Sequence, residues 1–311
     1  MTPAHTRPVI AIGALHIDTI AHAREPIRPE TSTPARLASQ PGGVATNLAR
    51  ALARLDTPVR LVGTVGDDSA AELLTRRLTG EGILLSVLPR PGFATGQYLA
   101  LHDPSGALAA ACVDDRVLAE APADLFDDLV TGLVSTPADD TIWFADANLP
   151  EAMLVRLAGR IGPGRLIASA VSEAKSARLK PVLTALDCLM LNRGEAAALT
   201  GLPPDAAAQH LADALAQTGL HSFVMTCGAQ DVHVLEAGTI RTFAPPKTGP
   251  ETGIIDVTGA GDALIAGVIA ARARGHGLSD AVPFGLEAAA LTLASTGALA
   301  ETLSWDALRR V

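Results

Sequence analysis

After residue 140, two kinds of segment alternate regularly, and this constrains the fold more than any other feature of the sequence. Short apolar runs without helical spacing, typical of buried strands, are separated by longer alanine-rich segments typical of helices. The expected strands are residues 141–145, 165–170, 188–191, 222–227, 232–235 and 239–243. The expected helices are residues 150–160, 172–186, 195–200, 205–218, 261–274, 279–294 and 305–310. The alternation predicts a mostly parallel sheet covered by helices, in three layers.

The first 140 residues follow the same pattern only in part. The expected elements are strands at 9–15 and 59–64 and helices at 47–55 and 69–78. Between them, residues 16–41 are polar and rich in proline. Two strand-like runs, 98–102 and 107–113, flank the turn sequence Asp-Pro-Ser-Gly at 103–106. We therefore expect a hairpin that stands off the main sheet, within one α/β domain spanning residues 1–311.

Composition narrows the classes of partner. The net charge is −9 and basic residues form no cluster, so we expect neither a nucleic-acid nor a membrane partner. Cys112, Cys188 and Cys227 each lie in an apolar run and are expected to be buried thiols. Residues 1–8 lack the apolar stretch of a signal peptide, which favours a cytoplasmic location.

A glycine-rich segment at residues 256–263 opens a long apolar helix. Gly259 and Gly261 allow a tight turn, and the first N–H groups of the helix face outward at the positive end of its dipole. Such a site suits the charge on a transferring phosphoryl group, and Asp262 could accept the proton of an attacking hydroxyl. The alternatives are a dinucleotide fingerprint, although its third glycine would fall at Leu264, or an aspartate that only stabilises the helix start.

Four motifs, this segment among them, resemble those of the PfkB (ribokinase-like) carbohydrate kinases. DVTGAGDALIAG at 256–267 resembles the C-terminal signature of that family. GGVATNLA at 42–49, with Gly-x-x-Gly-Asp-Asp at 63–68, resembles the N-terminal signature. NRGE at 192–195 matches the family's N-x-x-E motif, and residues 224–228 match its T-x-G strand end. The motifs occur in the family's order over nearly the whole chain, which makes the resemblance specific.

The resemblance implies a ribokinase-like three-layer α/β/α fold with a small β-sheet lid, formed here by residues near 16–41 and 96–113. It implies ATP as the phosphate donor, bound in the C-terminal half, together with Mg²⁺. Asp262 would be the catalytic base. The anion hole would be formed by Gly259, Ala260 and Gly261. The residues that bind the nucleotide would be Asn192, Thr226, Gly228, Gly259 and Gly261.

By the same resemblance, Asn192 and Glu195 would hold Mg²⁺ and phosphate, Asn192 through a water molecule. Their spacing points both side chains the same way, and Mg²⁺ needs only one or two carboxylates. The alternative for this pair is a helix cap with a reciprocal glutamate. The family further implies a monovalent cation, K⁺, near Asp256 and Thr258.

On the acceptor side, Asp18 follows the first expected strand, where open α/β sheets bind ligands. The resemblance implies that Asp18, Gly42, Gly43 and Asn47 contact the substrate. The alternatives are an aspartate that caps a turn and a loop followed by an ordinary helical asparagine. Lid strands with exposed apolar faces often pair between subunits, so a homodimer is expected.

Within the family, residues 146–150 and 171–181 are similar to those of pseudouridine kinases. The predicted reaction is therefore ATP-dependent phosphorylation of pseudouridine to its 5′-phosphate. The first alternative is a kinase for ribose, fructose or another nucleoside. The second, from a different class, is a non-catalytic sugar- or nucleotide-sensing protein on the same fold.

The sequence also departs from the pseudouridine kinases. Thr46 stands where those enzymes usually carry an arginine, and Ser169 and Ala170 stand where an Asp-Pro pair is expected. Lys175 could approach the substrate or a phosphate, or it could be a solvated helical lysine. His16 shows no metal-binding spacing and is interpreted as a strand-end or surface histidine.

Overall fold

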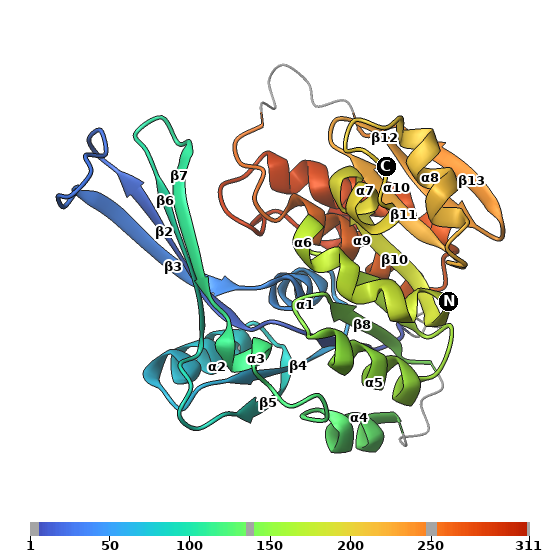
Figure 1. Ribbon diagram of the computed structural model, residues 1–311, viewed down its shortest axis with the longest axis horizontal. Coiled ribbons are helices and arrows are strands. Elements are labelled where there is room, and N and C mark those ends of the chain that lie inside the picture. Colours follow the sequence, from blue (N-terminus) through green and yellow to red (C-terminus); the bar gives the residue numbers. More distant parts are fainter. Residues whose placement is uncertain (1–5, 135–139, 247–253, 310–311) are drawn as a thin grey trace.

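The computed structural model describes residues 6–134, 140–246 and 254–309, whose strands form two sheets. The larger sheet has the order β13-β12-β11-β10-β9-β8-β1-β4-β5 (Figure 1). Its strands are β1 (Val9–Ile12), β4 (Val59–Val65), β5 (Leu84–Pro89), β8 (Ile142–Asp146), β9 (Leu166–Ser169), β10 (Leu186–Asn192), β11 (Phe223–Cys227), β12 (Gln230–Glu236) and β13 (Thr239–Phe243). In this order, neighbouring strands from β5 to β11 are parallel, and β12 is antiparallel to both of its neighbours, β11 and β13. The predicted mostly parallel sheet is confirmed.

Helices cover both faces of this sheet and bury an apolar cluster on each. One face carries α1 (Val44–Arg54), α2 (Ser69–Gly80), α9 (Ala260–Ala273), α10 (Leu278–Leu293) and α11 (Trp305–Leu308). The other carries α3 (Arg116–Ala119), α4 (Asp127–Val134), α5 (Glu151–Ile161), α6 (Glu173–Ser176), the 3₁₀ helix η1 (Ala177–Ala185), α7 (Arg193–Thr200) and α8 (Ala208–Ala216). Helix α9 is apolar around its circumference because α1 and α10 pack against it, in addition to the sheet. The three-layer prediction is confirmed.

The smaller sheet forms the lid, which stands away from the body in Figure 1 as two long hairpins. Its order is β3-β2-β6-β7, with bounds β2 (His16–Ala23), β3 (Ala35–Gly42), β6 (Gly96–His102) and β7 (Leu108–Asp114). The predicted β6–β7 hairpin is present, and Asp103 fixes its turn by accepting hydrogen bonds from the N–H groups of Ser105 (2.8 Å) and Ala107 (3.0 Å). Strand β1 passes into β2 through residues 13–15, which joins the lid directly to the centre of the main sheet.

Several sequence predictions were wrong in detail. The helix expected at 172–186 is a short α6 followed by the 3₁₀ helix η1, because Pro181 lacks an N–H group and disrupts α-helical hydrogen bonding. The strand expected at 9–15 ends at Ile12. Cys188 and Cys227 are buried as expected, but Cys112 is exposed because it lies on the edge strand β7. The last residue of the helix expected at 305–310 lies outside the described residues.

Among the helices of the described residues, none combines the length and the apolar character needed to cross a membrane.

Candidate functional site

The N-terminus of α9 carries four of the predicted site residues: Gly259, Ala260, Gly261 and Asp262. Gly259 is its N-cap, with a left-handed φ of 75°, and a Cβ atom there would lie 2.3 Å from the carbonyl oxygen of Ala298. Only glycine fits this turn. The first intrahelical bond runs from the N–H of Ala263 to the carbonyl of Gly259 (2.8 Å). The first turn, with Gly261 and Asp262, therefore presents backbone N–H groups that suit an anion.

Asp262 lies in this first turn and contacts the neighbouring helix α1. The Nδ2 group of Asn47 donates a hydrogen bond of 2.8 Å to its Oδ2 atom. Burial raises the pKa of Asp262 to about 7, the hydrogen bond from Asn47 opposes that shift, and the nearby carboxylates of Asp146 and Asp18 add to it. A carboxyl group with a pKa near neutrality is suited to accept a proton from a hydroxyl.

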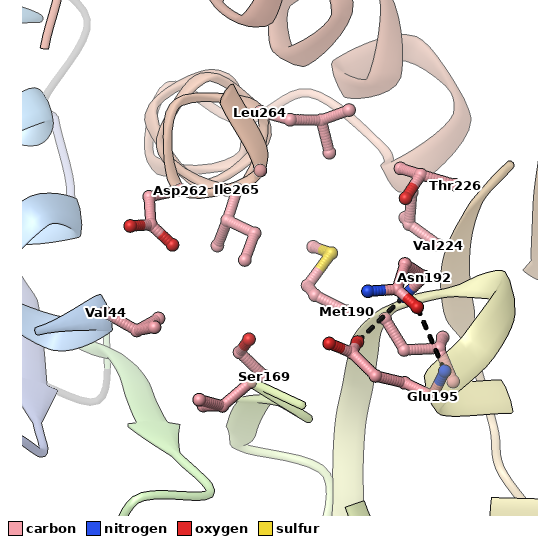
Figure 2. Close-up of a pocket in the computed structure, with 13 residues that line it drawn as sticks. Val44, Ser169, Met190, Asn192, Glu195, Val224, Thr226, Asp262, Leu264 and Ile265 are labelled. Atoms are coloured by element: carbon pink, nitrogen blue, oxygen red, sulfur yellow. Dashed lines mark hydrogen bonds between the residues drawn. The ribbon is translucent and has the colours of Figure 1, made fainter. Parts of the chain in front are cut away.

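A pocket of about 190 Å³ extends from Asp262 across the carboxyl ends of the strands. Figure 2 shows Asp262 and Val44 at one end, and Asn192, Glu195 and Thr226 at the other. The remaining lining residues are Ser169, Val171, Met190, Leu191, Val224, Gly261, Leu264 and Ile265. The pocket therefore joins motifs that lie far apart in the sequence, and its mainly apolar walls suit a small ligand with a few polar contacts.

Asn192 and Glu195 form the helix cap that was one of their two predicted roles. The Oδ1 atom of Asn192 accepts from the N–H of Glu195, and the Oε2 atom of Glu195 accepts from the N–H of Asn192, both at 2.9 Å. Burial raises the pKa of Glu195, and the N–H of Asn192 partly offsets this. Both side chains also line the pocket, so the cap places a carboxylate there.

The other nucleotide-side predictions separate in the structure. Thr226 lines the pocket, whereas Gly228 is exposed at the turn between β11 and β12, with φ 65°, and is not part of the lining. Asp256 ties two loops together. Its Oδ1 atom accepts from the N–H of Thr258 and its Oδ2 atom from the N–H of Gly297, both at 2.9 Å.

The predicted acceptor residues come together at the junction of lid and body. Asp18, on β2, packs against Gly42 so closely that a Cβ atom at that glycine would lie 1.9 Å from the carboxylate. Gly43 caps α1, the helix that carries Asn47. Burial raises the pKa of Asp18 to about 6, and Arg50 partly offsets this. The Oδ1 atoms of Asp18 and Asn47 are buried and have no hydrogen-bond partner among the described residues, so each can accept a hydrogen bond from a ligand.

Asp146 is a site-forming residue that sequence reasoning did not single out. Its buried carboxylate accepts hydrogen bonds from the N–H groups of Ala14 (3.3 Å), Ala45 (2.9 Å) and Asn148 (3.0 Å). It therefore ties the ends of β1 and β8 to the start of α1, and α1 carries Asn47. A charged residue at the end of an apolar strand was the available signal.

Comparison with solved structures defines the class of protein. The chain superposes on a carbohydrate kinase from Agrobacterium tumefaciens with a TM-score of 0.84 and 29% identity, covering 98% of this chain and 96% of the other. It superposes on the ribokinase of Arabidopsis thaliana, solved with ribose and ATP, with a TM-score of 0.82 and 19% identity, covering 98% of each chain. The fold is therefore the ribokinase-like α/β fold with a four-stranded lid, as predicted.

The sequence comparisons define the family. The model of the pfkB family of carbohydrate kinases matches residues 7–305, and the chain belongs to that family. The chain is 28% identical to the pseudouridine kinase of Escherichia coli (strain K12) over 285 residues, which are 89% of this chain and 87% of that enzyme. The chain is thus a sugar or nucleoside kinase that transfers a phosphoryl group from ATP to an alcohol.

Proposed function

We propose that this kinase phosphorylates the 5′-hydroxyl of pseudouridine. The similarity to the Escherichia coli pseudouridine kinase supports this acceptor, as do residues 146–150 and 171–181. The observation that carries the chemistry is the position of Asp262, held by Asn47 at the start of α9 and facing the pocket. Because the donor is ATP, we assign the enzyme to the cytoplasm.

Asp262 acts as the general base. The acceptor oxygen forms its bond to the γ-phosphorus while its proton passes to Oδ1 of Asp262, because Oδ2 already accepts from Asn47. The bond between phosphorus and the β-phosphate oxygen breaks, and ADP leaves with that electron pair. The N–H groups of Gly259, Ala260 and Gly261 would stabilise the charge that develops on the transferring group, although that of Ala260 also donates a long hydrogen bond to the carbonyl of Val257 (3.4 Å).

The acceptor is held mainly by oxygen atoms that lack a partner within the protein. Oδ1 of Asp18 and Oδ1 of Asn47 accept hydrogen bonds from sugar hydroxyls, which would satisfy two buried polar atoms at once. Gly42 and Gly43 lack side chains that would keep the sugar away from the backbone. A polyhydroxylated acceptor therefore suits this end of the site better than an apolar one.

At the other end, Asn192, Thr226 and Gly228 bind the nucleotide, and Glu195 faces the phosphates. No group of three or more acidic, histidine or cysteine residues that could cage a metal occurs among the described residues. The second carboxylate oxygen of Glu195, Oε1, suits Mg²⁺, which keeps several waters and would neutralise phosphate charge when bound. Asp256 and Thr258 remain the proposed K⁺ residues. Both Asp256 oxygens already hold backbone N–H groups, so we assign that cation no step.

We further propose that two copies pair through β7 of the lid. This edge strand is exposed along almost its whole length and has the sequence LAAACVD, without proline or lysine. The opposite edge, β3, carries Arg36 and Pro41, which discourage pairing. Ala110→Lys should convert a dimer to a monomer, whereas Ala38→Lys on β3 should not. Light scattering after gel filtration checks both, and a monomeric wild type would contradict the proposal.

The acceptor is tested by following ADP formation with pseudouridine, uridine, adenosine, ribose, fructose and no acceptor, with Mg²⁺ and K⁺ present. We expect turnover with pseudouridine and a product phosphorylated at the 5′-oxygen. Turnover restricted to another acceptor would discard pseudouridine and keep the proposed role of Asp262. Nucleotide binding without turnover of any acceptor would instead favour the sensor alternative.

A further inference from the structure

A partly buried polar cluster lies beside the acceptor residues and has no role in the phosphoryl transfer described above. The Nζ group of Lys175, on α6, donates a hydrogen bond of 2.7 Å to Oδ1 of Asn148 and lies 3.5 Å from Oδ2 of Asp115. The side chains of Lys175 and Asp115 are only 23% and 22% exposed. Lys175 is therefore not the solvated helical lysine that was one of its two interpretations.

His16 connects this cluster to the acceptor residues. It is 6% exposed, and its ring packs against Gly96 at the base of the lid. Within the part of the chain that the structure describes, its Nε2 atom has no hydrogen-bond partner. His16 and Asp18 are two positions apart on β2 and therefore lie on the same face of the lid sheet. Burial lowers the pKa of His16 to about 4. The nearby carboxylate of Asp115 raises this pKa, and the ammonium of Lys175 lowers it, both by less than burial does. A neutral buried imidazole can donate a hydrogen bond to a ligand or accept one from it.

The backbone around the cluster is held firmly. The guanidinium of Arg178 donates to the carbonyl oxygens of Ala147 (3.0 Å) and Asn148 (2.9 Å). Val171, which lines the main pocket, has a left-handed φ of 66°, a conformation that is costly for a β-branched residue. Ser172 then caps α6. Lys175 therefore extends from a fixed turn and is held by two partners. Such a preorganised donor suits recognition of a ligand.

The cluster offers hydrogen-bond donors and acceptors side by side. Lys175 supplies an ammonium donor, Asp115 an acceptor, and Asn148 both kinds of group. An imide edge, in which an N–H group lies between two carbonyl groups, is complementary to such an arrangement. The uracil ring carries this edge, whereas cytosine presents an acceptor and an amino donor instead.

We propose that Lys175, Asn148 and Asp115, next to His16, form a base-recognition subsite that selects acceptors with an imide edge. This inference rests on the proposed nucleoside kinase activity and adds the residues that discriminate the base. Lys175 donates to a ring carbonyl and Asp115 accepts from the imide N–H, while Asp18 and Asn47 hold the sugar. The cluster includes no residue to which we assign proton or phosphate transfer.

The test compares pseudouridine with its N1-methyl and N3-methyl derivatives, because only the second methyl group blocks the imide N–H. In the wild type, kcat/KM should stay within about twofold for the N1-methyl compound and fall about 10- to 100-fold for the N3-methyl compound, as expected for loss of a hydrogen bond to a charged group. In Lys175→Met, which loses the donor to a ring carbonyl, kcat/KM for pseudouridine should fall by a similar factor. In Asp115→Ala, which loses the acceptor of the imide N–H, the ratio between the two derivatives should approach one. Lys180→Met, at the exposed lysine of the same segment, should change neither value.

Three outcomes would overturn the inference. Equal turnover of both methyl derivatives by the wild type would show that the imide edge is not read, while pseudouridine kinase activity would stand. Equal losses for all three compounds in Asp115→Ala, with the ratio unchanged, would make Asp115 a structural residue. Turnover of a different acceptor, with none of pseudouridine, would overturn this inference and the proposed acceptor together. The comparison of derivatives in the wild type needs no variant, so misfolding of Lys175→Met or of Asp115→Ala leaves the test intact.

Discussion

The two ends of the pocket differ in how far their polar groups are satisfied by the protein itself. At the nucleotide end, Asn192 and Glu195 hold each other in a reciprocal helix cap. At the acceptor end, Asp18, Asn47 and His16 each have a buried polar atom that finds no partner in residues 6–134, 140–246 and 254–309. Groups that leave buried atoms unpaired cost stability and persist where a ligand completes them. The nucleotide end is thus part of the fold, whereas in the proposed function the substrate would complete the acceptor end.

The largest effect that this contrast predicts is at Asp262. Asp262→Asn keeps the shape of the side chain and removes the base, so the rate of phosphoryl transfer should fall by about 10²- to 10⁴-fold. Nucleotide binding should survive, because the N–H groups of the α9 terminus belong to the backbone. Initial rates and nucleotide titration measure the two quantities. Unchanged turnover, or a variant that does not fold, would contradict the assignment.

The pH dependence should separate activity from stability. Asp262 must be ionised to accept a proton, so the rate should rise with pH through about 7. The raised pKa values of Asp18 and Asp262 mean that folding favours their protonated forms. Their contribution to stability is therefore full below about pH 4, the ordinary carboxyl range, and is lost as pH rises through about 6 and 7. A pH series of rates and of urea unfolding should thus give opposite trends for these groups.

Substitution of Asn47 should shift the pH–rate curve directly. Its hydrogen bond favours the ionised form of Asp262, so Asn47→Ala should move the midpoint of the pH–rate curve upward. The midpoint, rather than the rate, is the informative quantity because the variant also loses a substrate contact. A midpoint that stays in place or moves downward would contradict the link between the two side chains.

The smallest predicted effects concern the nucleotide end, where stability should change. Asn192→Ala removes a helix cap and should lower the free energy of unfolding by about 1 kcal/mol. Glu195→Gln can keep the reciprocal cap and should leave stability nearly unchanged, while raising the Mg²⁺ concentration needed for half-maximal rate. Urea unfolding and a Mg²⁺ titration of each variant test the contrast. A large loss of stability in Glu195→Gln would mean that its charge, and not only its geometry, supports the fold.

The sequence predicted the main sheet and the motif positions because both depend on local patterns. Buried parallel strands such as β8 are continuous apolar runs, and the glycines around α9 mark a turn that only glycine can adopt. The β6–β7 hairpin of the lid was predicted from its turn sequence. Residues near 16–41 were assigned to the lid by family resemblance, and strands β2 and β3 were not visible as strands. Strand β3 is largely exposed, whereas β2 is mostly buried or half-buried. The pairing of β2 with both β3 and β6 stabilises them.

Part of the site could not be predicted because it depends on contacts between distant segments. His16 was interpreted as a strand-end or surface histidine. It does begin a strand, but it is buried because Gly96 lies against it, 80 positions further along the chain. Asp146 binds the backbone of residues from two other elements, and Lys175 meets an aspartate 60 residues away. The spacing of residues that are close together in the sequence does not predict such contacts.

The short passage from β1 to β2 has a consequence for the order of events in catalysis. Asp18 moves with the lid, whereas Asp262 belongs to a helix of the body, and residues 13–15 are the link between the two strands. The angle of the lid therefore sets the distance between Asp18, the proposed acceptor-binding residue, and Asp262, the proposed base. In an open lid the γ-phosphate would face a base with no acceptor beside it. Closure over a correct acceptor is then the event that commits ATP, and acceptor binding sets the timing of the reaction.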